Sequence, residues 1–217
     1  MNPIVLIPAR LGSTRLPGKV LADIGGKPMI AHVLERALRA GLGPVAVACG
    51  EAQVAEAVEK AGGIAVMTDP DLPSGSDRIW AALRRLDPAG AHDVIVNLQG
   101  DLPSIDPSYL ATVVKPLAQG FDIGTLVAPI TTEAERDAPS VVKCACAFPE
   151  DAEISPALYF SRHLIPSGEG PHWHHIGIYA YRRAALERFV TLPPSPLERR
   201  EALEQLRALE AVSYTHL

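Results

Sequence analysis

Residues 4 to 19 read IVLIPARLGSTRLPGK, and this stretch indicates how the chain begins to fold. Its first six residues are a short apolar run, typical of a strand that is buried on both faces of a parallel sheet. The loop that follows carries Arg10, Arg15 and Lys19 between glycines and a proline. Because the protein as a whole is mildly acidic, three cations in so short a loop predict a site for a specific anion.

The composition limits the classes of protein to which the chain can belong. It has 217 residues, 47% of them hydrophobic and 21% charged, with a formal net charge of −5. These values predict a buried core, and they argue against a diffuse nucleic-acid surface, which needs a basic domain. We expect no signal peptide and no membrane span, since no apolar run approaches roughly 18 residues. Three cysteines without CxxC spacing predict free thiols and a cytoplasmic location.

Apolar periodicity predicts that strands and helices alternate up to about residue 130. The expected strands are 4–9, 44–50, 64–67, 93–101 and 121–130, and the expected helices are 28–40, 51–63, 76–86 and 106–120. Such alternation is typical of an α/β fold with a mostly parallel, twisted sheet flanked by helices. In these sheets ligands bind beyond the carboxyl ends of the strands, so we expect the loops after the strands to meet there.

The pattern loosens after residue 131. Residues 131–140 are polar and predict a connection, and 141–148 and 174–182 predict strands. Residues 195–210 predict one charged, amphipathic helix. We therefore expect a core of residues 1–131 and a second portion of the same domain at 132–217.

The loop from Gly12 to Lys19 is similar to a phosphate cradle, although it does not match the P-loop pattern. One residue too many separates its glycines, and Val20 stands where that pattern has the hydroxyl that binds Mg²⁺. Its glycines still allow backbone amides to approach an anion, and its cations supply charge. The alternative is a cationic loop that is merely solvated.

Asp101 comes directly after the predicted strand 93–101, in the segment NLQGDLP. Mg²⁺ prefers oxygen ligands and commonly joins one or two carboxylates to substrate phosphates, so Asp101 is a candidate magnesium ligand. The alternative is that it only caps the following turn. Gln99 could hydrogen-bond a sugar or a base.

Other polar residues allow two interpretations each. Arg78, in SGSDR at the start of a predicted helix, could reach the ligand or pair with an acid. Arg162, His175, Tyr179 and Tyr181 could bind an acidic, hydroxyl-rich molecule, or could serve only in packing. The histidines at 172, 174 and 175 make a poor zinc site, because neighbours along a strand point to opposite faces.

Taken together, seven segments resemble the CMP-Kdo synthetases, the cytidylyltransferases that activate 3-deoxy-manno-octulosonate (Kdo). They are IPAR…STRLPGK, GGKPMIAHVLERA, SGSDR, VNLQGD, ALYFSR…IP, HIGIYAYR and PPSPLE…EALEQLR, in the family's order and across nearly the whole chain. The resemblance implies a Rossmann-like nucleotidyltransferase fold of the glycosyltransferase-A type. It also implies transfer of CMP from CTP to Kdo with Mg²⁺, for lipopolysaccharide biosynthesis.

Carried onto this sequence, the resemblance implies a role for each candidate residue. The CTP phosphates would be held by Arg10, Ser13, Arg15 and Lys19, and the nucleotide or sugar would be placed by Arg78 and Gln99. Arg15, Lys19 and Asp101 would be catalytic, with Asp101 the metal ligand. The Kdo side would be lined by Gln99, Arg162, His175, Tyr179, Glu204 and Gln205. Residues 1–131 would bind the nucleotide, and 132–217 would bind the sugar and form a homodimer.

The sequence departs from the family pattern in two places. Leu102 replaces an acidic residue beside the metal ligand. Family members also continue for some thirty residues with a second metal carboxylate, so the resemblance implies a chain that is truncated at its C-terminus. Two alternatives follow: an enzyme for a related acid sugar such as 8-amino-Kdo, and an impaired remnant that binds CTP without turning it over.

Overall fold

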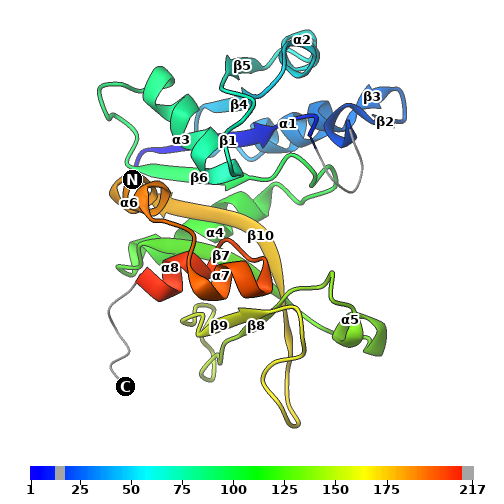
Figure 1. Ribbon diagram of the computed structural model, residues 1–217, viewed down its shortest axis with the longest axis vertical. Helices are drawn as coiled ribbons and strands as arrows, with labels where there is room; N and C mark the ends of the chain where they lie inside the picture. The colour runs from blue at the N-terminus through cyan, green and yellow to red at the C-terminus, as the bar shows by residue number, and fades with distance from the viewer. Residues whose placement is uncertain (13–17, 212–217) are drawn as a thin grey trace. The chain divides into compact units, whose positions relative to one another are not determined.

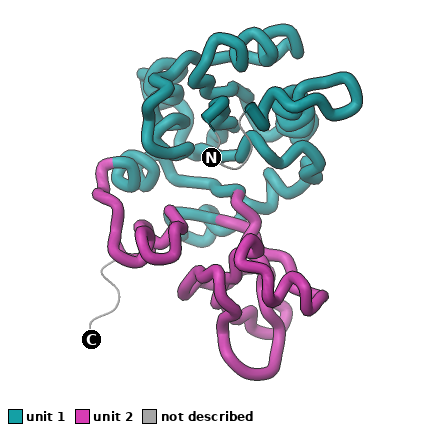
Figure 2. Tube along the Cα trace, turned by 45° about the vertical axis from the view of Figure 1, so that its right-hand side comes forward, with its two compact units in different colours: residues 1–124, 178–190 teal, residues 125–177, 191–217 magenta. Residues whose placement is uncertain are grey.

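The structure is a computed structural model that describes residues 1–12 and 18–211 (Figure 1). The chain forms two compact units (Figure 2). Unit 1 comprises residues 1–124 and 178–190, and unit 2 comprises residues 125–177 and those from 191 onward. The boundary therefore falls after residue 124, where the sequence suggested 131, and residues 178–190 return to unit 1. The strand β10 (Trp173–Arg182) makes this return, which no local pattern signals.

Unit 1 contains the strand order β5–β4–β1–β6–β10. Its strands are β1 (Pro3–Ala9), β4 (Val45–Cys49), β5 (Ile64–Met67) and β6 (Val94–Leu98), with the second half of β10. The pairs β1–β4, β1–β6 and β4–β5 are parallel, whereas β10 runs antiparallel to β6. The prediction of an α/β fold with a mostly parallel sheet is confirmed. A separate hairpin consists of β2 (Asp23–Ile24) and β3 (Lys27–Pro28).

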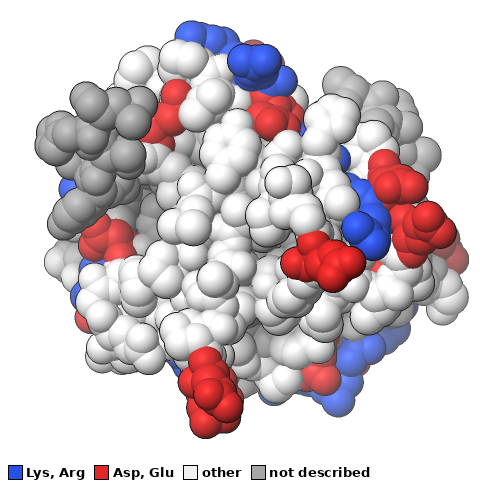
Figure 3. Space-filling view, turned by 90° about the horizontal axis from the view of Figure 1, so that it is seen from below, with Lys and Arg blue, Asp and Glu red and all other residues white. Residues whose placement is uncertain are grey.

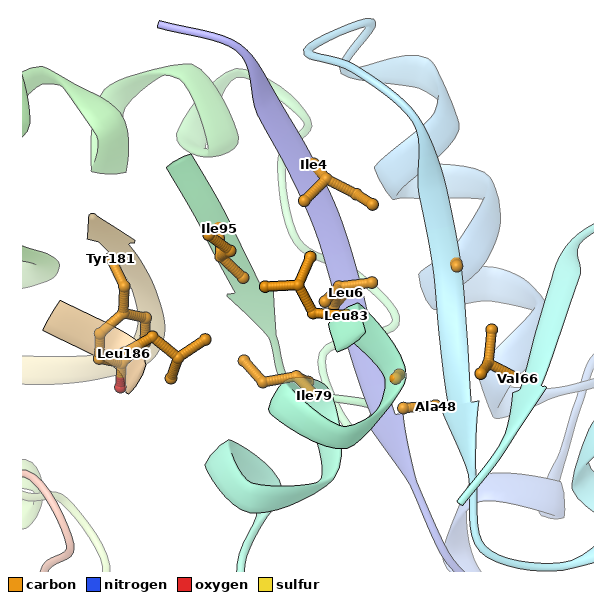
Figure 4. Packing of buried hydrophobic residues seen from close by; sticks show 11 residues of the cluster. Ile4, Leu6, Ala48, Val66, Ile79, Leu83, Ile95, Tyr181 and Leu186 are labelled. Atoms are coloured by element: carbon orange, nitrogen blue, oxygen red, sulfur yellow. The ribbon is translucent and has the colours of Figure 1, made fainter. Parts of the chain in front are cut away.

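Helices cover both faces of the unit 1 sheet. They are η1 (Lys19–Leu21), α1 (Met29–Arg39), α2 (Ala52–Lys60), α3 (Gly75–Leu86), α4 (Ser108–Ala118) and α6 (Arg183–Thr191). The close-up in Figure 4 shows Ile79 and Leu83 of α3 packed against Leu6 and Ile95 of the strands. Alternate strand residues such as Val5 point to the opposite face, where α1, α2 and α4 contact the strands. A sheet buried on both faces is what the continuous apolar runs predict.

The sequence did not predict α6, although it lies in unit 1. Arg183, its first residue, donates from Nη1 to Asp87 Oδ2 at 2.6 Å and from Nη2 to the Asp87 backbone oxygen. Asp87 also accepts the backbone amides of Ala91 and His92, which together with Arg183 hold the pKa of its carboxyl at about 2. This helix is fixed by contacts between segments that are far apart in the sequence, so local periodicity indicates it only weakly.

Unit 2 is built on short antiparallel strands. β8 (Lys143–Ala145) pairs with β9 (Tyr159–Ser161) and with the first residues of β10, and β7 (Ile123–Pro129) also pairs with β10. Its core joins Cys144, Phe160, Leu203 and Leu206. The expected polar connection contains a short helix, α5 (Glu133–Asp137), whose N-cap Thr132 accepts from the Glu135 amide.

The single helix expected over residues 195–210 is wrong. The segment forms two short helices, α7 (Pro196–Glu201) and α8 (Leu206–Ala211). Between them Ala202 adopts the left-handed conformation, with φ of 54°. Apolar periodicity does not detect this break, because the same residues remain good helix formers.

Three further properties concern membrane spans, surface charge and the cysteines. Within residues 1–12 and 18–211, no helix is both long enough and apolar enough to cross a membrane. On the face in Figure 3, both acidic and basic side chains are scattered among uncharged ones, and the described atoms there form no broad basic patch. The cysteines at 49, 144 and 146 are free thiols.

Candidate active site

The loops after the parallel strands of unit 1 approach one another closely. A Cβ on Gly100, which follows β6, would lie 2.9 Å from the backbone oxygen of Pro8 in β1. A Cβ on Gly75, at the start of α3, would lie 3.3 Å from Pro8 Cγ and 3.7 Å from Gln99 Oε1. These glycines allow the ends of β1 and β6 and the first turn of α3 to meet. We call this part of unit 1 the strand-end rim.

The cationic loop begins and ends at fixed points on this rim. The Leu11 amide donates to Glu51 Oε2 at 2.9 Å, which ties the start of the loop to the segment after β4. The Gly18 amide donates to the Leu11 backbone oxygen at 2.9 Å and closes the loop at its base. Gly18 has φ of 70°, a conformation that glycine adopts without strain. Glu51 was not singled out from the sequence.

Lys19 and Asp101 form an ion pair at the rim. Lys19 Nζ lies 3.0 Å from Asp101 Oδ2, and the two side chains are 35% and 50% exposed. Lys19 begins η1, immediately after the loop, and Asp101 follows β6. One triphosphate-sized ligand can therefore reach both groups. Ser13 and Arg15, which were expected beside them, lie outside the described residues.

Arg78 lies inside unit 1, with 1% of its surface exposed. Its Nη1 donates to Thr68 Oγ1 at 2.7 Å and to the Asp69 backbone oxygen at 3.0 Å, and its Nη2 donates to the Pro70 backbone oxygen at 3.0 Å. Burial, with a smaller contribution from Arg10, lowers the pKa of Arg78 below its usual value. Its guanidinium thus fixes the loop after β5, a role that the sequence did not predict.

The ends of β4 and β6 carry further groups close to the rim. The strand residue Asn97 is buried, and its Oδ1 accepts from Gln99 Nε2 at 3.0 Å, which orients the Gln99 amide. Burial raises the pKa of Cys49 to about 11, so its thiol stays protonated and is a poor nucleophile. The chemistry available at the rim is therefore charge stabilisation and positioning.

In unit 2 the structure brings together four of the residues that were expected on the sugar side. Gln205 Nε2 lies 3.5 Å from His175 Nδ1, and His175 Nε2 lies 2.9 Å from Thr125 Oγ1. Arg162 binds the backbone of the turn that carries Glu204 and Gln205. Tyr179 belongs to unit 1, where its ring packs 5.9 Å from that of Tyr181, at the edge of the core.

Burial controls the titration of His175. The side chain is buried, and this burial, with a smaller contribution from His174, lowers its pKa to about 4. At neutral pH the ring is therefore uncharged and can both donate and accept a hydrogen bond. A neutral ring suits recognition of hydroxyl groups better than that of a carboxylate.

Among the described residues of the rim, Asp101 is the candidate ligand for a magnesium ion. Asp101 offers one accessible carboxylate, and Mg²⁺ is commonly held by one or two carboxylates together with substrate phosphates. Among the described residues, no group of three or more His, Cys, Asp or Glu side chains gathers to hold a metal ion. The chemistry of the donors therefore fits an ion that is bound jointly with a nucleotide.

Comparison with known proteins gives concordant results. A family model described as cytidylyltransferase matches residues 4–214. The 3-deoxy-manno-octulosonate cytidylyltransferase of Paramagnetospirillum magneticum is 60% identical over 211 residues, which cover 97% of this chain and 86% of that protein. The protein of the same name from Methylobacterium nodulans is 61% identical over 215 residues, covering 97% and 85%.

The solved structures agree with this similarity. A CMP:2-keto-3-deoxy-manno-octonic acid synthetase complexed with CTP superimposes with a TM-score of 0.86 at 41% identity, covering 97% of this chain and 86% of that one. A cytidylyltransferase from Leptospira borgpetersenii superimposes with a TM-score of 0.57 at 20% identity, covering 96% and 71%. At that identity the second likeness bears on the fold alone.

Proposed function

This chain belongs to the cytidylyltransferase family, and on that premise we propose that it transfers CMP from CTP to the anomeric hydroxyl of Kdo. The hydroxyl loses its proton and its oxygen bonds to the α-phosphorus, the bond from that phosphorus to the oxygen bridging it to the β-phosphorus breaks, and pyrophosphate leaves. The product is CMP-Kdo, the activated sugar for lipopolysaccharide biosynthesis. The observation that carries the proposal is the pairing of Lys19 with Asp101 at the strand-end rim, in a chain so similar to enzymes of that name.

The residues of the rim would act by stabilising the negative charge that develops on the phosphates. Attack at the α-phosphorus spreads negative charge over the equatorial oxygens and the leaving pyrophosphate, so cations placed there lower the barrier. Lys19 and Arg10, which flank the described ends of the loop, would stabilise this charge, together with Arg15 and the hydroxyl of Ser13. Gln99, oriented by Asn97, would contact the nucleotide or the sugar.

The sugar would be bound by the residues that the family resemblance assigns to it, among them Arg162, His175, Tyr179, Glu204 and Gln205. His175, neutral at pH 7, would hold Gln205 through a ring nitrogen, and Gln205 would exchange hydrogen bonds with sugar hydroxyls. Glu204 would accept from a hydroxyl, and Arg162 would add positive charge near an acidic sugar. The expected cofactor is Mg²⁺, which Asp101 would hold together with the phosphates; when bound, it would neutralise phosphate charge.

The test measures pyrophosphate release from CTP with Kdo, with 8-amino-Kdo and with neither sugar. Release that depends on Kdo supports the proposal. Release only with 8-amino-Kdo would reassign the sugar, and binding of CTP without release would identify a nucleotide-binding protein. A chelator should abolish turnover, and added Mg²⁺ should restore it; unchanged turnover in the chelator would refute the metal requirement.

Two further expectations follow from the resemblance. The enzyme is expected to be a homodimer, which light scattering during size-exclusion chromatography measures directly. A cytoplasmic location is also expected, because CTP is drawn from the cytoplasm. Fractionation of the producing cells tests that expectation.

A further inference from the structure

The turn between α7 and α8 in unit 2 is held by side-chain hydrogen bonds, and Glu201 lies at its start. Residues 202–205 form the turn, and it carries Glu204 and Gln205, two of the side chains on the proposed sugar side. Gln205 Nε2 lies 3.5 Å from His175 Nδ1, so the course of the turn determines where these side chains stand. A continuous helix would place them elsewhere. Whatever holds this turn open therefore affects sugar binding.

The Glu201 carboxylate fastens the end of α7 to β9. Its Oε1 accepts from Ser161 Oγ at 3.0 Å and lies 3.5 Å from the hydroxyl of Tyr159. Its Oε2 accepts from the Arg162 backbone amide at 3.1 Å and lies 3.2 Å from Ser161 Oγ. These hydrogen bonds hold the carboxylate in a single rotamer. Because the acceptor is charged, they are stronger than hydrogen bonds between neutral groups.

The backbone that follows Glu201 is held by Arg162. Its Nε donates to the Glu201 backbone oxygen at 2.9 Å, and its Nη2 donates to the Ala202 backbone oxygen at 3.1 Å. Its Nη1 donates to the Pro139 backbone oxygen at 3.2 Å. The last carbonyls of a helix lack partners within the helix, and here the guanidinium satisfies them as the chain turns away. Ala202 can then take the left-handed conformation that ends α7.

The far side of the turn is fixed separately. Arg207, in α8, donates from Nε and Nη2 to the two carboxylate oxygens of Glu198 at 2.9 and 2.6 Å. Both side chains are largely buried. Since α8 is thus tied back to α7, its position relative to β9 depends on the hydrogen bonds that Glu201 and Arg162 make.

We infer that Glu201 is a positioning residue for the sugar: its carboxylate locks the end of α7 onto β9, so that Gln205 stays beside His175. It contacts the protein only, and it acts on the sugar through the turn. This inference rests on the proposed function, and it adds a residue that the sequence patterns did not single out. It predicts that loss of the carboxylate weakens sugar binding and leaves nucleotide binding intact.

The first experiment measures KM for each substrate in the Glu201→Gln variant. Glutamine keeps the shape, but it removes the negative charge and leaves only one oxygen to accept from the Arg162 amide and Ser161 Oγ. We expect KM for Kdo to rise about tenfold, as for the loss of a hydrogen bond to a charged group, with KM for CTP unchanged. Glu169→Ala, at an exposed position of unit 2, is the matched control and should change neither. Equal changes in both KM values, or no change in KM for Kdo, would overturn the inference.

A second comparison separates positioning from direct contact. Ser161→Ala removes the hydroxyl that holds Glu201, and it should raise KM for Kdo in the same direction. If Glu201 acts through this network, combining Ser161→Ala with Glu201→Gln adds little to the larger single effect. Fully additive effects would mean that Glu201 works independently of β9, and the inference would be abandoned.

Hydrogen exchange provides a readout that needs no substrate. The Leu203 amide donates to the Glu198 backbone oxygen of α7, and the amides of Leu206, Arg207 and Ala208 donate to backbone oxygens of the turn. Glu201→Gln should speed their exchange about tenfold relative to the wild type, whereas Glu169→Ala should not. Unchanged exchange would refute the anchoring role even in a protein that is inactive with Kdo. If the wild type is inactive with Kdo while Glu201→Gln still speeds amide exchange as expected, only the proposed function is rejected.

Discussion

Lys19 Nζ lies 3.0 Å from Asp101 Oδ2, which joins the loop after the first strand to the segment after β6. The two residues are 82 positions apart in the sequence, and they meet because parallel strands present their carboxyl ends at one edge of the sheet. Both side chains remain partly exposed, so this pair contributes less than about 1 kcal/mol to stability. Its position at the rim therefore suggests a functional role more than a structural one.

Replacing Lys19 tests this role. We expect Lys19→Ala to lower kcat/KM about 10²-fold or more, the order found when one charge-stabilising donor is lost. The melting temperature should hardly change, because the pair is exposed. Lys27→Ala is the matched control, since Lys27 is an exposed lysine of unit 1 that pairs with Glu35 at 3.5 Å. Near-normal turnover of Lys19→Ala in steady-state assays would contradict the role given to the rim.

Arg78 should be required for stability. Arg78→Lys removes the planar fork that reaches Thr68, Asp69 and Pro70, and it leaves buried acceptors without donors. The expected loss in the free energy of unfolding is about 3 kcal/mol, measured by urea denaturation. Arg84→Ala, at an exposed position of the same helix, should stay within about 0.5 kcal/mol of the wild type. A stable Arg78→Lys protein with a raised KM for CTP would instead favour direct contact with the nucleotide.

Gly100 should tolerate no side chain. A Cβ there would stand 2.9 Å from the Pro8 backbone oxygen, so Gly100→Ala must push the end of β6 away from β1. Displacement of the adjacent Asp101 is expected to lower kcat/KM by about 10²-fold, since a shift near 1 Å can cost that much. Gly177→Ala is the comparison, because a Cβ at Gly177 meets nothing within 4 Å. Full activity of Gly100→Ala would show that the rim is more tolerant than its packing indicates.

His175 should make stability depend on pH. Its pKa is about 4 in the folded protein and 6.5 when unperturbed, so the unfolded chain takes up the proton first as the pH falls. The free energy of unfolding is therefore unaffected by this proton above pH 6.5. It falls between pH 6.5 and 4, by at most about 1.4 kcal/mol per pH unit for one proton. Urea denaturation across this range measures the slope.

A non-titrating side chain isolates the contribution of His175. His175→Gln should flatten the slope between pH 6.5 and 4. Trp173 fluorescence in a Trp80→Phe background reports on unit 2 alone, since Trp80 belongs to unit 1. The same slope in His175→Gln as in the wild type would assign the effect to another group.

Some features of the candidate site could not be predicted from local patterns. The residues near Arg78 permitted either a ligand contact or an ion pair, and the structure instead shows three acceptors in the loop after β5. Glu51 and Glu201 are ordinary acidic residues in helix-like sequence. Their importance comes from partners about forty residues away, to which neither periodicity nor spacing points.

The sequence by itself determined the alternation of strands and helices in the first half, the parallel sheet, and the cationic loop opposite an acidic strand end. These follow from apolar runs, glycines and charges that act locally, along one strand, one helix or one loop. Only the tertiary structure decided the return of β10 to unit 1, the break between α7 and α8, and the burial of Arg78. Each of these depends on hydrogen bonds or packing between distant segments, whose free energy no short stretch of sequence contains.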